Sequence, residues 1–390
     1  MLLSARETAD RLGIKIETLY AYVSRGLIKS AEVEGSRERR YDAEEVERFR
    51  GARGGGRGPR AEPEALMPVI GSSICLIENH RIYYRGQDAL RLADTVTLEE
   101  IAVLLWEDDA AAASASPQPR KRGTDARAGE RRGTSVGLIE RCQIRLAELS
   151  NQDLAALDLG RAGVIHTGRR ILAELAAAIA GATPSPLPVH EQLAEKWRLD
   201  ARGADLVRRC LVLLADHELN ASTFVARCVA STRATPYAVV SAALAALSGR
   251  RHGGASARAE ALFRELGDDP APLPALAARL ARGERLPGLG QPLYPQGDPR
   301  CPAIIAALAK ALPEAGARIA AAAVAARELT GEYPNVDFAL GAATSALGLP
   351  PGAALGIFLV ARSVGWIAHA IEQYESGVLI RPRARYIGKR

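Results

Sequence analysis

Alanine-rich segments with large apolar residues at helical spacing constrain the fold of this chain more than any other feature. From Leu154 and Leu157 to Leu175, such residues recur three and four positions apart, which predicts buried helix over 153–180. Few β-branched stretches lie between these segments, and aromatic residues make up only 5% of the chain. A mainly helical protein follows. The same pattern predicts helices over 206–214, 236–247, 303–312, 317–329 and 353–371.

Two segments lack the apolar residues that a packed core requires. Residues 51–67 are rich in glycine and arginine and predict a flexible linker. Residues 110–135 are small, polar and basic, and they predict a disordered loop. We interpret this loop as solvated surface rather than as a nucleic-acid contact, because a run of charge alone is weak support for binding.

The positive charge of the chain is concentrated in its first part and in this loop. The net charge is +6, of which residues 1–60 contribute a surplus of 3 and residues 110–136 a surplus of 4. The remaining, enzyme-sized part of the chain is therefore nearly neutral. Any affinity for nucleic acid would come from the first 60 residues or from the loop.

The cysteines and the apolar runs indicate the compartment. Five cysteines are scattered without a CxxC pair, which argues against a zinc site or a disulfide framework and favours a reducing cytoplasm. Charges occupy the start of the chain, where a signal peptide needs an apolar segment, and runs such as 319–326 are too short to span a bilayer. We expect a cytoplasmic protein without a membrane segment.

Residues 1–50 predict a small helical domain. Ser4 and Glu7 form a capping box for a first helix, which ends at Gly13. A second helix is expected from about Ile16 to Arg25, after a glycine-containing turn. Its small core would hold Leu12, Leu19 and Val23, and a third helix would follow over 42–50.

This first domain resembles the winged helix-turn-helix of mercury-resistance-type regulators and phage excisionases, on the stretch SARETADRLGIKIETLYAYVSRGLI followed by SRERRY and DAEEVERF. In that family the second helix and the wing touch DNA. Tyr22 is expected on or beside the exposed face of the second helix. With so small a charge surplus, a module for interaction or dimerisation without DNA binding is the alternative. The resemblance implies DNA contacts by Lys15, Thr18, Tyr20, Arg37, Arg39 and Arg40.

In the larger part of the chain, histidine, aspartate and arginine residues stand in distinctive surroundings. His217 lies between acidic residues, His252 precedes two glycines, and Asp337 follows a proline at the start of an apolar helix. Arg362 and Arg381 offer guanidinium groups suited to carboxylates. Four other histidines are interpreted as hydrogen-bonded core or surface residues: His80, His166, His190 and His369.

The order of these motifs resembles the citrate synthase family. YRGQD, ADHELNAST, RHGGA, DPR, PNVDF, GWIAHAIEQ and IRPRARYIG follow one another between residues 74 and 388, with the loop at 110–135 left out. The resemblance implies an all-α fold with large and small helical domains. The large domain would comprise 68–250 and 355–390, the small domain would comprise 251–354, and the protein would be a homodimer.

The resemblance also implies a reaction, the condensation of acetyl-CoA with oxaloacetate to give citrate and CoA. Asp337 would remove a methyl proton while a neutral His252 hydrogen-bonds the carbonyl oxygen of the thioester. Acetyl-CoA would be a substrate, with no permanently bound cofactor and no metal. The dicarboxylate would be bound by His217, Arg300, Arg362 and Arg381, with Arg381, in preference to Arg383, coming from the other subunit.

One departure from the family pattern affects the chemistry. Gln291 stands where the family has the histidine that activates the ketone. An amide donates a hydrogen bond but is not protonated at neutral pH, which predicts a slow catalyst. The segment 292–296 lacks the positive charges that usually meet CoA phosphates, and Ser256 replaces a family asparagine.

Two hypotheses remain. One is a citrate or methylcitrate synthase, which the retained Asp337 and His252 favour. The other is a regulator that binds a dicarboxylate or acyl-CoA without turnover and signals to the DNA-binding module, which Gln291 and the attached helix-turn-helix favour.

Overall fold

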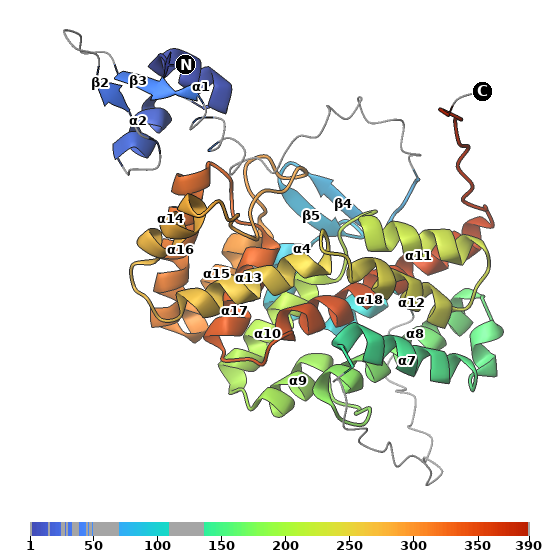
Figure 1. Cartoon of the computed structure of the whole chain (residues 1–390). Helices are drawn as coiled ribbons and strands as arrows, with labels where there is room; N and C mark the ends of the chain where they lie inside the picture. The colour runs from blue at the N-terminus through green and yellow to red at the C-terminus, as the bar shows by residue number, and fades with distance from the viewer. Residues whose placement is uncertain are drawn as a thin grey trace.

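The computed structural model describes residues 2–14, 16–24, 28, 30–32, 39–43, 46, 49, 70–108 and 136–388. Most of these residues are helical (Figure 1). Both the predicted linker at 51–67 and the predicted loop at 110–135 lie outside the described residues, as does most of the third helix expected over 42–50. The fold class expected from the sequence, all-α with a small helix-turn-helix domain at the front, is confirmed.

The first domain pairs two short helices with a small antiparallel sheet. Ser4 caps the first helix, and the reciprocal bonds with Glu7 complete the predicted capping box. Gly13 ends it in the left-handed conformation with φ of 65°. The sheet has the order β1-β3-β2. The elements are β1 (Leu2–Leu3), α1 (Ala5–Leu12), α2 (Ile16–Ser24), β2 (Ala31–Glu32) and β3 (Arg39–Asp42).

One expectation for α2 is wrong. Tyr22, expected beside the exposed face, is fully buried. It lies three positions after the buried Leu19, on the same face of the helix, and its ring packs against Phe49 with 5.5 Å between ring centroids. Tyr22 therefore belongs to the core of the domain.

Two tight hairpins open the larger body. β4 (Cys75–Glu78) pairs with β5 (Arg81–Tyr84), and β5 pairs with β6 (Gln87–Asp88). Each turn has two residues, 79–80 and 85–86, and all four have positive φ between 47° and 79°. Such turns match the twist of the strands they join.

Helices make up the rest of the body, and each segment predicted to be helical contains a helix. The helices are α4 (Ala89–Thr95), α5 (Leu98–Trp106), α7 (Leu138–Ser150), α8 (Arg161–Ala180), α9 (Val189–Trp197), α10 (Ala201–Leu214), α11 (Ala221–Ser231), α12 (Pro236–Leu247), α13 (Gly253–Leu266), α14 (Pro272–Ala281), α15 (Arg300–Ala311), α16 (Pro313–Thr330), α17 (Val336–Ala346) and α18 (Ala353–Ser376).

The start of the segment 153–180 differs from the prediction. A short 3₁₀ helix, η1 (Leu154–Leu157), precedes α8, and residues 158–160 separate the two. Leu154 and Leu157 are 81% and 68% exposed, although their spacing predicts burial. The change of direction before α8 turns both side chains outward.

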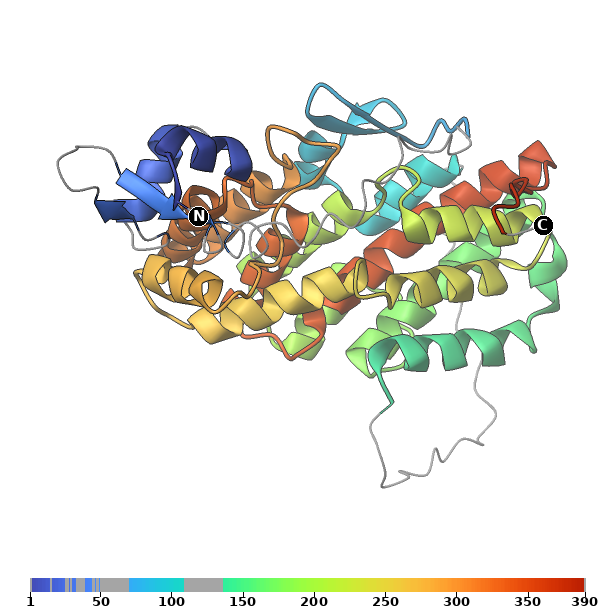
Figure 2. The same ribbon diagram turned by 45° about the horizontal axis from the view of Figure 1, so that its top comes forward.

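The long helix α18 lies in the middle of the body. It contacts α5, α8, α10, α11, α12 and α13 (Figure 2). By length and composition α18 could cross a membrane, but 94% of its most apolar window is buried by its neighbours, as in the core helix of a globular domain. Helices α13 to α17 gather at one end of this helix and α7, α8, α11 and α12 at the other (Figures 1 and 2).

Candidate active site

Arg300 and Asp298 form a buried ion pair at the start of α15. The guanidinium donates to both carboxylate oxygens, at 2.9 and 2.7 Å, and the side chains are only 2% and 0% exposed. Asp298 Oδ2 also accepts the Val336 N–H at 3.1 Å. Burial alone would lower the pKa of Arg300, but the carboxylate reverses the effect and raises it. The pair joins the start of α15 to the start of α17 and keeps the Arg300 guanidinium protonated inside the body, where Asp298 compensates its charge.

Arg362 is a second buried cation, halfway along α18. Its side chain is 1% exposed, Nε donates to the Leu214 carbonyl at 2.8 Å, and the guanidinium lies 4.8 Å from the centre of the Phe358 ring. Its Nη1 is buried without a hydrogen-bond partner among the described residues. An unpaired buried donor costs about 1–3 kcal/mol, so this position favours an acceptor such as a carboxylate.

His217 lies beside Tyr294, just after α10. Its Nε2 is 3.2 Å from the Tyr294 hydroxyl, and both side chains are buried. Burial, together with the charges of Arg300 and Arg362, lowers the pKa of His217 well below 6.5, so the imidazole is neutral at physiological pH. Burial also raises the pKa of Tyr294, so its hydroxyl keeps its proton.

His252 stands at the N-cap of α13. Its Nε2 is 2.8 Å from the Ser222 hydroxyl oxygen. Burial and the charge of Arg362 lower the pKa of His252 to about 4, which keeps it neutral. Ser222 Oγ also accepts the Trp366 indole N–H at 3.1 Å and donates to Asn220 Oδ1 at 2.9 Å.

Asp337 lies in the first turn of α17. Its Oδ1 accepts a short hydrogen bond from the Ser256 hydroxyl of α13. Burial raises the pKa of Asp337, and the Ser256 bond and the charge of Arg300 oppose that rise. A carboxylate with a raised pKa in a partly buried position is typical of a general base.

The loop that carries Gln291 is fastened to the start of α17. Asn335 Oδ1 caps α17 by accepting the Asp337 N–H at 2.9 Å, while Nδ2 of Asn335 donates to the Gly290 carbonyl at 2.9 Å. The backbone N–H groups of Asn335 and Gly290 donate to Gly288 and Tyr333 carbonyls, both at 2.8 Å. A Cβ on Gly288 would lie 2.6 Å from a backbone atom of Phe338, so only glycine allows this approach.

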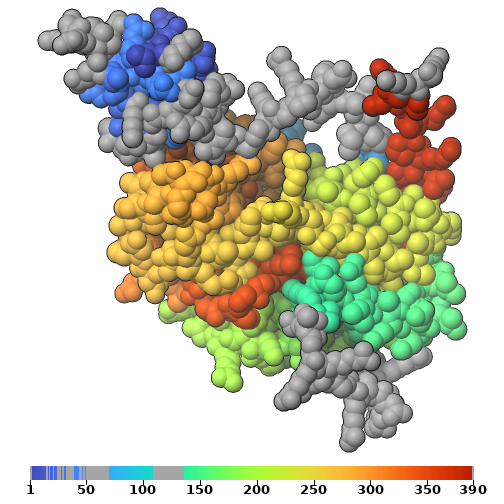
Figure 3. Space-filling model, viewed as in Figure 1, coloured from blue at the N-terminus to red at the C-terminus, as the bar shows by residue number. Residues whose placement is uncertain are grey.

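The body residues predicted for the site fall into two groups. The charge of Arg362 reaches His217, His252 and Asp337, and the charge of Arg300 reaches His217 and Asp337. These residues come from separate segments that the fold brings around two buried cations. Arg381 is not among them. It is exposed in the segment after α18, which stands out from the surface in red in Figure 3.

The predicted DNA-contacting residues belong to the first domain. Tyr20 is 52% exposed on α2, Thr18 is partly exposed on the same helix, and the exposed Arg39 donates to Ser30 Oγ at 3.3 Å. Arg40 is partly exposed on β3. Lys15 and Arg37 lie outside the described residues.

His369, interpreted from the sequence as a hydrogen-bonded core or surface residue, is a core residue. Arg227 donates to its Nδ1 at 3.0 Å, so Nε2 carries the proton and faces Asp216 Oδ2 at 3.3 Å. Arg227, His369 and Asp216 thus form a buried polar chain, which ends directly before His217. Gly365 allows this, because a Cβ there would lie 2.3 Å from Asp216 Oδ2.

Sequence reasoning assigned no role to four residues that shape the site: Ser222, Tyr294, Asp298 and Asn335. Two had a usable signal. Asp298 stands two positions before Arg300, the spacing of a carboxylate that folds back onto a guanidinium, and Asn335 stands two before Asp337, as an N-cap does. Ser222 and Tyr294 each contact a histidine that is distant in the sequence, and such a contact gives no signal in the neighbouring residues.

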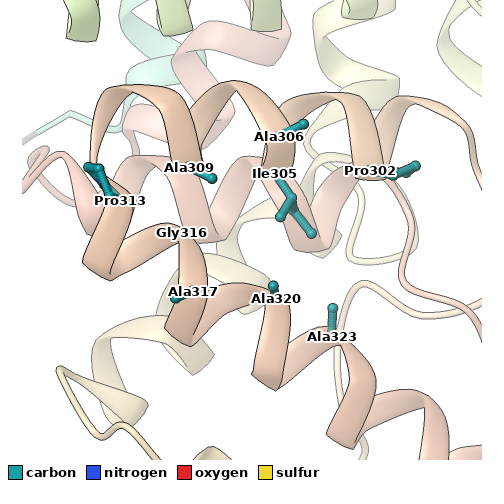
Figure 4. A pocket seen from close by; sticks show the side chains of 9 residues that line it. All are labelled: Pro302, Ile305, Ala306, Ala309, Pro313, Gly316, Ala317, Ala320 and Ala323. Carbon is teal, nitrogen blue, oxygen red and sulfur yellow. The ribbon is translucent and has the colours of Figure 1, made fainter.

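An apolar groove of about 540 Å³ lies elsewhere, between α15 and α16 (Figure 4). Alanine, proline, glycine and one isoleucine line it, so it offers no acid, base or charge for chemistry. Among the described residues no three His, Cys, Asp or Glu side chains gather as metal ligands. The chemistry therefore centres on the polar site around Arg300 and Arg362.

A family model described as citrate synthase, C-terminal domain, matches residues 65–383. The chain belongs to the citrate synthase family. A second model, described as a helix-turn-helix domain, matches residues 2–54. The helix-turn-helix expected at the front of this citrate synthase family member is thereby confirmed.

Named relatives include both citrate and methylcitrate synthases. The citrate synthase of Mycolicibacterium smegmatis is 30% identical over 356 residues, covering 80% of this chain and 90% of the relative. The citrate synthase of Haloferax volcanii is 42% identical over 194 residues, 48% of this chain and 51% of the relative. A 2-methylcitrate synthase of Mycobacterium tuberculosis is 38% identical over 185 residues, 46% and 47%. In the last two alignments the chain spans about half the length of the relative.

Solved citrate synthases share the fold. The enzyme of Thermotoga maritima superposes with a TM-score of 0.68 at 25% identity, covering 84% of this chain and 96% of the other. The enzyme of Thermoplasma acidophilum, solved as a ternary complex with carboxymethyl coenzyme A and oxaloacetate, has a TM-score of 0.65 at 23% identity, covering 83% and 95%. The second likeness shows the fold alone.

Proposed function

We propose that this chain is a citrate synthase-type acyltransferase that condenses acetyl-CoA, or a related acyl-CoA, with oxaloacetate. The observation that carries the proposal is that His252 and Asp337 stand at the starts of two helices, α13 and α17, that are joined by the Ser256–Asp337 hydrogen bond, and that the charge of Arg362 acts on both. A carboxylate base and a neutral imidazole donor are what removal of a weakly acidic methyl proton requires.

Oxaloacetate would occupy the region between the two buried arginines. Arg362 keeps an unpaired buried donor, Arg300 holds a fixed charge, and the neutral His217 offers a ring nitrogen for a hydrogen bond. A substrate carboxylate would satisfy the unpaired donor of Arg362 and offset the cost of burying that charge, while Arg300 is already paired with Asp298. Binding of oxaloacetate by a relative, in the Thermoplasma acidophilum complex, supports this assignment.

The reaction would begin with proton transfer from the acetyl methyl group to the Asp337 carboxylate. The C–H electron pair forms the enol double bond, and the thioester oxygen takes the displaced pair while His252 donates to it. As the thioester carbonyl re-forms, the enol carbon attacks the ketone carbon of oxaloacetate, the ketone π pair moves to its oxygen, and that oxygen takes a proton from solvent water. Water hydrolyses the resulting citryl-CoA, releasing citrate and the free CoA thiol.

Ser222 would set the tautomer that this role requires. A neutral imidazole donates from one nitrogen only, and Nε2 of His252 faces Ser222. For the proton of His252 to stand on Nδ1, free for the thioester oxygen, Ser222 would turn its one proton from Asn220 Oδ1, to which it donates at 2.9 Å, to Nε2. Asn220 permits this, because its Oδ1 also accepts the Thr223 N–H at 3.0 Å and keeps a partner.

A second copy of the chain would complete the site. Arg381 lies in the exposed segment 377–388, which leaves α18 beside α11, at the end of the body away from α14 and α16 (Figures 1 and 2). An extended segment with a guanidinium and no place in its own site suits exchange between protomers of a homodimer.

The five free cysteines support a reducing compartment, the cytoplasm.

Release of free CoA thiol from acetyl-CoA and oxaloacetate tests the reaction. We expect thiol release by the full chain and its loss, by ~10²-fold or more, in Asp337→Ala. Ser248→Ala is a matched control, since that hydroxyl only donates to the Ala245 carbonyl on α12. Equal rates in the full chain and in Asp337→Ala would refute the proposal.

The helix-turn-helix domain and Gln291 favour a second function, a ligand-sensing regulator that binds DNA. In that case Thr18, Tyr20, Lys15, Arg37, Arg39 and Arg40 would contact the duplex. Thermal stabilisation by oxaloacetate without thiol release would favour this alternative. DNA binding whose affinity changes with oxaloacetate would support it directly.

A further inference from the structure

Helices α13 and α17 approach each other at backbone contact distance. A Cβ on Gly341 of α17 would lie 2.6 Å from the backbone carbon of Ala259 and 2.6 Å from the nitrogen of Glu260, both on α13. The two helices therefore touch without an intervening side chain at this point. Any larger residue at 341 would push them apart.

This contact sets the distance between Ser256 and Asp337. Ser256 lies three residues before Ala259 on α13, and Asp337 lies four residues before Gly341 on α17, so each pair shares one helix face. Close packing one turn away brings the serine hydroxyl against the carboxylate. The hydrogen bond between them is a consequence of how these helices cross.

The hydrogen-bonding capacities of the two groups decide the direction of the bond. Ser256 is fully buried and has one hydroxyl proton, which it donates to Oδ1 of the ionised carboxylate. The backbone N–H of Asp337 is already used by Asn335. Within the described part of the chain no hydrogen bond reaches Oδ2, so this oxygen keeps its full capacity to accept a proton.

We propose that Ser256 is a positioning residue that holds Oδ1 of Asp337 and thereby makes Oδ2 the oxygen that takes the substrate proton. This rests on the function proposed above, because the proton in question is that of the acyl methyl group. The bond fixes rotation of the carboxylate about its Cβ–Cγ axis and keeps the abstracted proton on the open side. It also stabilises the ionised form and opposes the effect of burial.

Ser256 departs from the family pattern described above, which has an asparagine amide at this position. Both side chains can donate to a carboxylate, but the hydroxyl brings a single proton and the amide two. The serine leaves no second donor that could compete for Oδ2 or for the substrate.

The test is the ionisation of Asp337 in full-length Ser256→Ala, measured by carbon-13 NMR titration of the aspartate carboxyl signals. Asp337→Asn identifies the signal. Loss of a hydrogen bond to the ionised form should raise the pKa of Asp337 by about one pH unit. A base works only above its pKa, so the acid limb of the plot of thiol-release rate against pH should move to higher pH by the same amount. The rate on the alkaline plateau should stay within a few-fold of that of the original protein.

Two further variants keep the test decisive. Ser256→Cys preserves the shape but donates weakly, so its shift should be smaller than that of Ser256→Ala and in the same direction. Thr344→Val removes another buried hydroxyl from α17, one that binds backbone carbonyls, and should leave the pKa of Asp337 unchanged.

The outcomes separate this inference from the reaction itself. An unchanged pKa of Asp337 in both Ser256 variants overturns the role of Ser256, whatever the rate of turnover. A shifted pKa in a protein that releases no thiol supports the hold on Asp337 while refuting the proposed reaction.

Discussion

Gln291 differs chemically from the histidine that the family resemblance predicts at this position, because an amide cannot be protonated at neutral pH. We predict that Gln291→His raises the rate of thiol release by ~10²-fold or more, the usual contribution of a proton-transfer group. Initial rates at saturating acetyl-CoA and oxaloacetate measure the gain. Gln291→Asn keeps an amide and should give none. No gain with histidine would mean that another step limits turnover.

At the scale of residues, the sequence predicts the charged groups better than their partners. His252, Asp337 and Arg300 stand in motifs that can be read locally, and the fold places them around buried positive charge. Ser222 and Tyr294 could not be assigned in this way. Each acts on a histidine 30 or 77 positions away, and only the tertiary fold creates such a pair.

At the scale of elements, the crossing of α13 and α17 governs the site. Gly341→Ala would force a methyl group against the backbone of Ala259, and we predict a loss of about 1–3 kcal/mol in the free energy of unfolding. Activity should fall as well, because the same change separates Ser256 from Asp337. Urea denaturation and thiol release measure the two effects.

Gly203→Ala in α10 is the control for this substitution. There an added methyl meets only side-chain atoms, at 3.1 Å or more, so we expect a smaller change in stability and no specific loss of activity. Equal effects of the two substitutions would contradict a special role for the crossing.

The elements themselves were largely predictable, since apolar spacing marks a buried helix wherever the helix stays in the core. The prediction for Leu154 and Leu157 was wrong because spacing does not show where the chain changes direction. Tyr22 was placed on the wrong face of α2 for a different reason, the mixed character of its side chain. A large aromatic with a polar hydroxyl suits a surface as well as a small core.

At the scale of the whole molecule, a site shared between two copies makes a sharp prediction. Arg362→Ala and Arg381→Ala should each abolish most thiol release. Mixed after reversible dissociation, the two inactive proteins should regain about a quarter of the original activity, since half of the dimers are mixed and each holds one complete site. If activity does not recover although exchange of subunits between the two proteins is verified, Arg381 lies outside the catalytic site.

Composition and helical periodicity predict a mainly helical protein, and the citrate synthase architecture was predicted from the resemblance that the ordered motifs carry. Two features could not be derived in this way. The antiparallel hairpins of β4 to β6 are too short to give a periodic signal. The segment after α18 carries no helix or strand pattern that would show where it lies.

The fastening of the Gln291 loop has a consequence for how this protein can change over generations. Its close hydrogen bonds run through backbone atoms and Asn335, and among the described residues the Gln291 side chain adds one long hydrogen bond, accepting the Leu293 N–H at 3.4 Å. Selection for stability therefore acts only weakly on residue 291. Selection at this position acts through the reaction chemistry. A single codon change could turn a swift catalyst into a slow one, or back, while leaving the scaffold intact.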